Sequence, residues 1–220
     1  MRPRYDWQLY LVTDRRLAGE RPIQSVVEAA VRGGVTAVQL REKDSSTREF
    51  VELGRALMRL LAPLGVPLMV NDRVDVALAI GATGVHLGQS DMDYATARRL
   101  LGPDAAIGVS VETVQQAREA EALDADYLGV GPVFSTATKP DAAPPLGLAG
   151  LAQVRSASRH LLVAIGGIGA ENARQAMDAG AGGVAVVSAI CAARDPEDAA
   201  RKLRLAIKPG EQNAGRNRPL

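Results

Sequence analysis

Two aspartates, Asp72 and Asp91, closely follow two successive short apolar runs, residues 68–70 and 85–87. If these runs form neighbouring strands about 4.8 Å apart, the two carboxylates extend from one edge of the sheet. Two such oxygen donors, with room for water and phosphate oxygens, suit a Mg2+ ion. The sequence therefore predicts Asp72 and Asp91 as metal ligands, although each could instead cap the helix that follows it.

Cationic side chains follow another apolar run, in the segment Gln39-Leu-Arg-Glu-Lys43. An extended backbone places Gln39, Arg41 and Lys43 on one side of the chain. Charge runs often lie on a solvated surface, but two cations facing two acids would bind a metal-bound diphosphate. Lys139 adds a third cation in the long loop 131–147, which is a candidate lid.

Glycines indicate a second anion site. The segment Ile165-Gly-Gly-Ile-Gly169 follows one apolar run, and Val187 and Ser188 end the last one. Backbone N–H groups at such positions hold phosphates in many barrel enzymes, although glycine pairs also serve ordinary turns.

Eight short apolar runs position these residues, and each ends on polar or glycine residues. Strands that alternate with helices predict parallel strands joined by right-handed crossovers. Eight units in 220 residues predict an α/β protein with a single (β/α)8 TIM barrel, whose active site lies at the carboxyl ends of the strands. The predicted strands are Leu9–Val12, Ala37–Leu40, Leu68–Val70, Val85–Leu87, Ile107–Val109, Tyr127–Val130, Leu162–Ile165 and Val184–Val187.

Helical patterns fill the segments between the runs. One apolar stripe begins at Ile23 and ends at Gly33-Gly34, where a left-handed cap is expected. A second helix is predicted over 47–61, and Asp195 should cap the last one. We predict a barrel catalytic domain over residues 1–208 and a disordered tail over 209–220, which has almost no apolar content.

Composition excludes several classes of function. Twenty-six basic residues against 25 acidic ones leave a net charge of +1, which argues against a nucleic-acid partner. The chain has no apolar run long enough for a membrane span, so we expect no membrane partner and a cytoplasmic location. A single cysteine, Cys191, excludes an intrachain disulfide and is predicted to be a buried hydrophobe. We interpret His86, in mid-strand, as structural and place His160 in an exposed link.

Eight motifs follow one another in the chain: Tyr10-Leu-Val-Thr-Asp14, Gln39-Leu-Arg-Glu-Lys43, Asn71-Asp-Arg-Val-Asp75, Gly84-Val-His-Leu-Gly-Gln89, Gly129-Val-Gly-Pro-Val-Phe134, Thr136-Ala-Thr-Lys139, Ala164-Ile-Gly-Gly-Ile168 and Val186-Val-Ser-Ala-Ile190. Together they resemble the motif series of the thiamine-phosphate synthase family. The resemblance implies a transferase of thiamine biosynthesis. Such an enzyme couples 4-amino-5-hydroxymethyl-2-methylpyrimidine diphosphate with 4-methyl-5-hydroxyethylthiazole phosphate, and its products are thiamine monophosphate and diphosphate.

The resemblance also implies roles for individual residues. The pyrimidine diphosphate would contact Gln39, Arg41, Lys43, Asn71, Ser110 and Lys139, and the thiazole phosphate would contact Thr136, Thr138, Gly167, Val187 and Ser188. Mg2+ would be the cofactor, held by Asp72 and Asp91, and the catalytic residues would be Lys43, Ser110 and Lys139. The chain departs from the family at Glu112, where the family often has histidine, and Glu112 could simply open its helix.

Charge stabilisation on a leaving diphosphate and positioning of two substrates would account for catalysis, through a pyrimidine cation and without a side-chain nucleophile. Three alternatives stay open. A sibling thiazole tautomerase would have no use for the paired aspartates, and another phosphate-handling barrel enzyme would not explain the whole motif series. A non-catalytic binder of thiamine precursors is separated from an enzyme only by assay. The expected partners are small-molecule substrates, and the sequence leaves the oligomeric state open, a homo-oligomer included.

Overall fold

Eight parallel strands form a closed barrel in the computed structural model, which describes residues 5–138 and 143–208. The strands follow one another in chain order, and β1 closes the barrel by pairing with both β2 and β8. The predicted (β/α)8 barrel is therefore confirmed, and no predicted strand end is more than two residues off. The strands are β1 (Leu9–Val12), β2 (Ala37–Leu40), β3 (Leu68–Asn71), β4 (Gly84–Leu87), β5 (Ala106–Val111), β6 (Tyr127–Val130), β7 (Leu162–Ile165) and β8 (Gly183–Val186).

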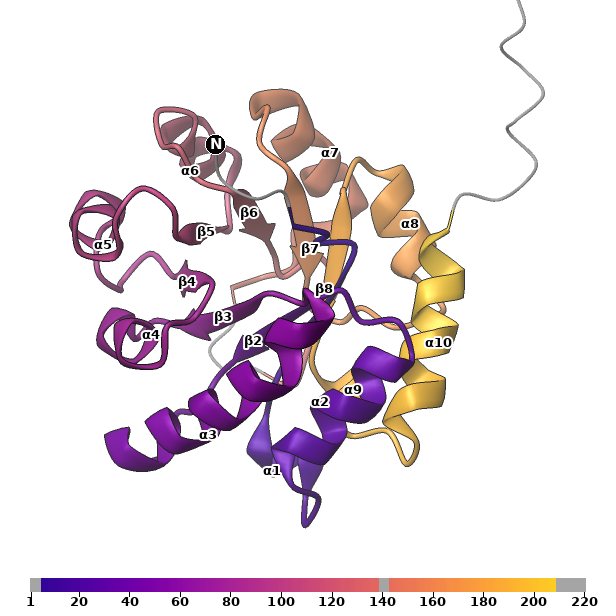
Figure 1. The fold of residues 1–220 in the computed structure, drawn as a ribbon. Helices are drawn as coiled ribbons and strands as arrows, with labels where there is room; N and C mark the ends of the chain where they lie inside the picture. The colour runs from indigo at the N-terminus through magenta and orange to yellow at the C-terminus, as the bar shows by residue number, and fades with distance from the viewer. Residues whose placement is uncertain (1–4, 139–142, 209–220) are drawn as a thin grey trace, which may run out of the picture.

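Helices surround the strands on the outside of the barrel (Figure 1). They are α1 (Arg15–Ala18), α2 (Ile23–Arg32), α3 (Thr47–Leu61), α4 (Val74–Ile80), α5 (Tyr94–Leu101), α6 (Val114–Ala120), α7 (Gly147–Ala157), α8 (Ala173–Asp178), α9 (Ser188–Cys191) and α10 (Pro196–Ile207), with a 3-10 turn over Ala62–Leu64. Local sequence sets several starts: Ser46 and Glu49 form a capping box at α3, and Asp195 accepts from the Asp198 N–H at α10. The predicted helix over 47–61 and the predicted Asp195 cap are confirmed.

The left-handed residue predicted at the end of α2 is Gly34, the second glycine of the pair. Gly33 has a right-handed φ of −76°, and Gly34 has the positive φ of 106°. Gly33 is needed for a different reason, because a Cβ there would lie 2.3 Å from the Glu197 carbonyl oxygen. The glycine pair thus combines a close approach to α10 with the turn into β2.

Three aromatic residues, Trp7, Tyr10 and Tyr127, gather inside the barrel. Tyr10 and Tyr127 point inward from β1 and β6 and pack with Trp7, whose ring centroid lies 4.6 Å from that of Tyr127. Alternate residues such as Leu9 and Leu11 belong instead to the larger cluster between strands and helices. The interior cluster consists of Trp7, Tyr10, Val12, Ala37, Met69, Ala106, Tyr127, Val163 and Ala185. Its aromatic rings form a floor beneath the carboxyl ends of the strands.

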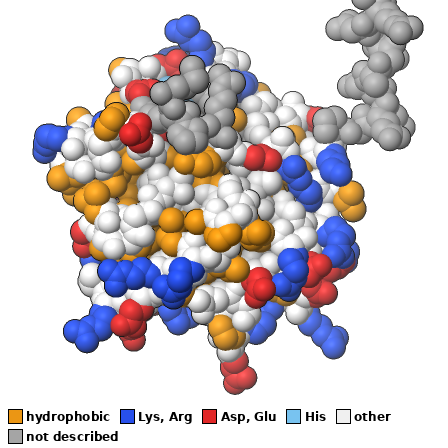
Figure 2. All heavy atoms as spheres, in the orientation of Figure 1, with side chains coloured by type: hydrophobic (Ala, Val, Ile, Leu, Met, Phe, Trp, Pro, Cys, Tyr) orange, Lys and Arg blue, Asp and Glu red, His pale blue; other side chains and the backbone are white. Residues whose placement is uncertain are grey.

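Other sequence expectations have mixed outcomes. Cys191 is fully buried, and burial raises the pKa of its thiol to about 11, as expected of an inert core residue. On the face shown in Figure 2, Lys and Arg side chains lie among Asp and Glu side chains. Among the residues described, no helix is both long and apolar enough to cross a bilayer. The predicted tail 209–220 lies outside the described residues, so the domain boundary at residue 208 stays a prediction.

The placement of His160 in an exposed link was wrong. Its side chain is only 13% exposed, and its ring nitrogens lie 2.9 Å from Glu121 Oε1 and 3.0 Å from the Leu123 carbonyl oxygen. Glu121, directly after α6, also accepts hydrogen bonds from the Ser158 hydroxyl and the Arg159 N–H. The Ser158 and His160 hydrogen bonds lower the pKa of Glu121 to about 2. This cluster ties the end of α6 to the segment that enters β7.

We predict that Glu121→Gln lowers the melting temperature by a few degrees at neutral pH. A carboxylate whose pKa is depressed on folding stabilises the protein fully above its ordinary pKa, 4.5, and loses that contribution as the pH falls towards 2. The difference between wild type and variant should therefore shrink between these two pH values. Thermal unfolding followed by circular dichroism measures it, with Glu119→Gln, an exposed glutamate of α6, as the control. A difference that is independent of pH would contradict this assignment.

Candidate active site

Polar residues from the strand ends line one cavity of about 620 Å3 at the carboxyl end of the barrel. The structure brings twelve of the thirteen residues assigned from the sequence to this cavity: Gln39, Arg41, Lys43, Asn71, Asp72, Asp91, Ser110, Thr136, Thr138, Gly167, Val187 and Ser188. The thirteenth, Lys139, lies outside the described residues. Their shared location fits the assigned roles, which themselves stay predictions.

The two aspartates form an interacting acid pair beside a cation. Lys43 Nζ lies 2.6 Å from Asp72 Oδ2, and the Asp72 side chain is 22% exposed. Desolvation pushes the pKa of Asp72 up, but hydrogen bonds with Asp91 and Lys43 outweigh it and hold that pKa below its usual value. Desolvation and the neighbouring Asp72 raise the pKa of Asp91. The two carboxylates therefore repel each other when both are ionised, and a divalent cation would relieve this repulsion.

Neither aspartate caps the helix that follows it, so that alternative is wrong. No side chain caps α4, and α5 is capped by Asp93, which accepts from the Thr96 N–H. Asp91 Oδ2 instead accepts from the Gly88 N–H at 2.7 Å and so closes the turn after β4. Asp72 has a φ of 62°, an unusual left-handed conformation for a residue other than glycine. Such strain often accompanies a functional position, and here it orients the carboxylate that pairs with Lys43.

The donor set fits a Mg2+ ion that is shared with an anionic ligand. Within residues 5–138 and 143–208, no three His, Cys, Asp or Glu side chains cluster closely enough to form a metal site of their own. Mg2+ commonly takes one or two carboxylates and completes its shell with water and substrate phosphates. Asp72 and Asp91 meet this requirement. Binding of Mg2+ stays a proposal, and it depends on a phosphate-bearing substrate.

Arg41 lies at the border of the cavity, where its backbone is anchored to the residue that follows β1. Its N–H donates to Thr13 Oγ1 at 3.0 Å, and its Nη1 lies 3.5 Å from Asp14 Oδ2. Its side chain stays 24% exposed, and that of Lys43 is 49% exposed. Lys43 is therefore held beside the acid pair and Arg41 beside Asp14, and both line the cavity while they remain accessible to a soluble anion.

Glycines shape the other side of the cavity. Gly166 and Gly167 have positive φ angles of 99° and 63°, and a Cβ on Gly167 would lie 2.4 Å from the Ser135 carbonyl oxygen. The loop after β6 therefore packs directly on this backbone. The same loop brings Thr136 and Thr138 to the cavity, and Ser188 meets them there from the start of α9. Hydroxyl groups beside bare backbone suit a phosphate group.

Sequence reasoning missed several residues of the cavity wall. His86 lines the cavity, with its Nε2 2.8 Å from Ser110 Oγ, and Tyr10 and Tyr127 lie beneath it. Desolvation, partly opposed by the Asp72 charge, lowers the pKa of His86 to about 4, so its ring is neutral at physiological pH. The two-residue period of strands could have identified these positions, because His86 shares the inward face with Gly88 two residues later. Glu112 also lines the cavity, one residue before the Thr113 cap of α6.

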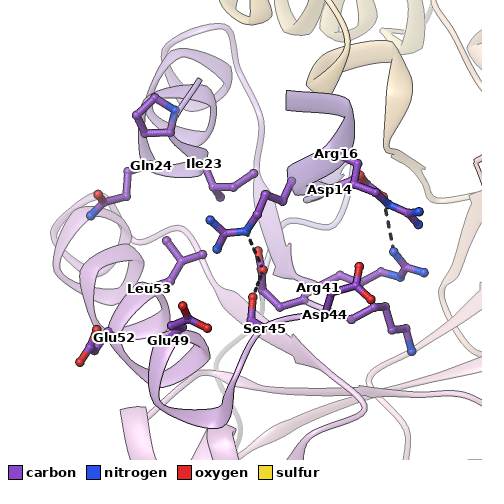
Figure 3. Close-up of a pocket in the computed structure, with 14 residues that line it drawn as sticks. Asp14, Arg16, Ile23, Gln24, Arg41, Asp44, Ser45, Glu49, Glu52 and Leu53 are labelled. Atoms are coloured by element: carbon purple, nitrogen blue, oxygen red, sulfur yellow. Dashed lines mark hydrogen bonds and ion pairs between the residues drawn. The ribbon is translucent and has the colours of Figure 1, made fainter. Parts of the chain in front are cut away.

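A second cavity, of about 550 Å3, lies beside the first and shares Arg41 and Lys43 with it. Figure 3 shows it between the start of α2, marked by Ile23 and Gln24, and the first turns of α3. The Glu42 carboxylate, only 2% exposed, accepts from Arg15 Nε at 3.0 Å and Ser45 Oγ at 2.5 Å. Its other oxygen, Oε1, is buried without a hydrogen-bond partner. Glu42 thus anchors the segment that carries both cations, at the cost of one unsatisfied oxygen.

We predict that Glu42→Ala destabilises the protein by about 1 to 3 kcal/mol, because two hydrogen bonds to a buried charged group are lost. Amide hydrogen exchange should also increase across residues 41–45. Thermal unfolding and exchange mass spectrometry measure the two effects. The control is Glu52→Ala, since Glu52 lines the same cavity but is exposed. Equal stability of the two variants would contradict the anchoring role of Glu42.

Comparisons with known proteins agree with this geometry. The sequence profile described as "Thiamine monophosphate synthase" matches residues 9–190. The thiamine-phosphate synthase of Albidiferax ferrireducens is 59% identical over 91% of this chain and 91% of its own, and that of Azorhizobium caulinodans is 52% identical over 93% and 96%. The solved thiamine phosphate pyrophosphorylase of Pyrococcus furiosus superposes with a TM-score of 0.85 and 42% identity, over 93% of this chain and 96% of its own. From the fold, the cavity and these matches together, the chain belongs to the thiamine monophosphate synthase family and is an enzyme of the transferase class.

Proposed function

We propose that the chain couples 4-amino-5-hydroxymethyl-2-methylpyrimidine diphosphate with 4-methyl-5-hydroxyethylthiazole phosphate, to give thiamine monophosphate and diphosphate. The observation that carries the proposal is the pairing of two unlike anion sites in one cavity of about 620 Å3. An acid pair with two cations lies on the side of β2 to β4, and hydroxyl groups and glycines lie on the side of β6 to β8. Two phosphate-bearing substrates can therefore meet with their reacting ends between these sites.

The diphosphate binds on the side of the acid pair in this proposal. Mg2+, when held by Asp72 and Asp91, would supply positive charge that neutralises the leaving diphosphate. Arg41 is suited to paired hydrogen bonds with phosphate oxygens, and Lys43 contributes a point charge. We assign Lys139 to the same end on the family resemblance. These charges matter most when the departing oxygen gains its full negative charge, so they act on the transition state.

The reaction then needs positioning more than a side-chain nucleophile. The bond between the pyrimidine methylene carbon and the diphosphate oxygen breaks, and its electron pair leaves with the diphosphate. The ring amine stabilises the resulting cation, and the lone pair of the thiazole nitrogen forms the new bond to the methylene carbon. Binding both substrates in one cavity supplies the required proximity. Cys191, the single cysteine, cannot serve as a nucleophile because it is buried and its thiol pKa is raised.

Two other functions make different predictions. A thiazole tautomerase would process the thiazole substrate alone and would leave the acid pair without a role. A non-catalytic binder would hold the precursors without product formation. The interaction between Asp72 and Asp91 favours the proposed enzyme over a tautomerase, because it becomes useful when a diphosphate and a divalent cation arrive together. Product formation separates the enzyme from a binder.

We predict that the purified chain forms thiamine monophosphate from the two substrates and Mg2+, and that chelation of the metal stops turnover. Asp72→Asn and Asp91→Asn should each lower kcat by about 100-fold or more, comparable to the loss of one preorganised electrostatic group. Product chromatography measures these rates. Asp93→Asn is the matched control, because Asp93 caps α5 two residues after Asp91.

Three results would contradict the proposal. Binding of both substrates without product would indicate a binder, and turnover of the thiazole phosphate alone would indicate a tautomerase. If Asp72→Asn and Asp91→Asn kept the full rate and the same Mg2+ dependence, the aspartates would not be the metal site.

A further inference from the structure

A continuous chain of side-chain hydrogen bonds crosses the barrel interior. Gln39 Nε2 lies 3.2 Å from Tyr10 Oη, and Tyr10 Oη lies 2.9 Å from Tyr127 Oη. Tyr127 Oη is 2.9 Å from His86 Nδ1, and His86 Nε2 is 2.8 Å from Ser110 Oγ. All five residues line the large cavity. The two ends, Gln39 and Ser110, are residues that the family resemblance assigns to the pyrimidine substrate, whereas the three middle residues have no assigned role.

The donors and acceptors of this chain determine its direction. The Gln39 amide nitrogen can only donate a hydrogen bond, so Tyr10 Oη accepts from it. The Tyr10 hydroxyl is then free to donate its own hydrogen bond to Tyr127. Tyr127 in turn donates to Nδ1 of His86. A neutral imidazole has one donor and one acceptor nitrogen, so Nε2 carries the proton and donates to Ser110. The Ser110 hydroxyl proton therefore remains free to be donated into the cavity.

The opposite direction leaves a buried proton without an acceptor. If Ser110 donated a hydrogen bond to His86, then His86 would donate to Tyr127, and Tyr127 would donate to Tyr10. Tyr10 would then accept from both Tyr127 and Gln39, and its own proton would have no acceptor within the chain. Tyr10 is only 1% exposed and Tyr127 is fully buried, so water cannot easily satisfy such a group. Only a reversed Gln39 amide, with its oxygen towards Tyr10, would make this direction favourable.

We propose that Tyr10, Tyr127 and His86 are positioning residues that fix Ser110 as a hydrogen-bond donor and the Gln39 oxygen as an acceptor towards the substrate ring. This inference rests on the proposed function for the identity of that ring. An aminopyrimidine offers an amine donor and ring-nitrogen acceptors, which complement this pair of ends. A pyrimidine with a carbonyl oxygen in place of the amine offers a different pattern and would leave the Gln39 oxygen facing an acceptor.

Nitrogen NMR tests the direction of the chain without any substrate. The protein has two histidines, so in His160→Gln the only imidazole signals come from His86. We expect the neutral tautomer with the proton on Nε2. The tautomer with the proton on Nδ1 would overturn the proposal, whatever the activity of the protein. If His160→Gln does not fold, the wild-type spectrum with its two histidine signals gives the same information.

Tyr127→Phe tests the consequence for substrate binding, because it removes the central hydroxyl and keeps the buried ring. We expect the KM for the pyrimidine diphosphate to rise about 10-fold, the effect of one weakened hydrogen bond, with the KM for the thiazole phosphate unchanged. In the Ser110→Ala background the same substitution should have little further effect. Trp7→Phe is the control, since Trp7 packs against Tyr127 in the same floor without joining the chain. It should lower the melting temperature and leave both KM values unchanged.

Three results would count against the role of the chain in substrate binding. One is an unchanged pyrimidine KM in Tyr127→Phe. Another is an equal rise of both KM values in Tyr127→Phe and Trp7→Phe, which would indicate a packing effect alone. The third is full additivity with Ser110→Ala.

If Tyr127→Phe does not fold, Tyr10→Phe breaks the chain at the neighbouring link and is expected to give the same difference between the two KM values. If the protein proves to be inactive, NMR of Tyr127→Phe still tests the chain, because the proton of His86 should no longer be confined to Nε2.

Discussion

Closure of the barrel is the constraint on which the candidate site depends. Because β1 pairs with both β2 and β8, every inward-facing residue at a strand end must share one enclosed volume with the others. The pairing register places Asn71 beside His86 and Ser110 beside Gly129. A slip of one residue would turn these side chains towards the helices and would place apolar ones in the cavity. The chemistry of the site therefore rests on strand register as much as on residue type.

The charged groups around the cavity contribute little to the stability of the fold. An exposed pair such as Lys43 and Asp72 contributes little to the free energy of unfolding, because water and salt screen it. The left-handed backbone of Asp72 and the unsatisfied oxygen of Glu42 both oppose folding. The hydrophobic layer between strands and helices is large enough to offset these costs. A scaffold of this kind can hold two carboxylates close together before any cation or substrate binds.

Sequence patterns predicted the barrel and twelve of the residues that line the cavity, because both depend on short-range regularities. Apolar runs followed by polar residues gave the strands, and barrel geometry then brought Asp72, Asp91 and Ser110 to one end. Features that depend on contacts between distant segments were not predicted. His160 is hydrogen-bonded to Glu121, 39 residues away, and the hydrogen bond between His86 and Tyr127 joins residues 41 positions apart. The positive φ of Asp72 has no local sequence signal, since left-handed positions are usually glycine.

We propose that the acid pair and its neighbouring cations form one site for a magnesium diphosphate group. Calorimetric titration with inorganic diphosphate, in the presence and absence of Mg2+, tests it most directly because no chemical step is involved. We predict that Mg2+ tightens diphosphate binding by about 10-fold or more, equivalent to about 1.4 kcal/mol, and that Asp72→Asn abolishes this gain. Equal affinity with and without Mg2+ in the wild-type protein would contradict it.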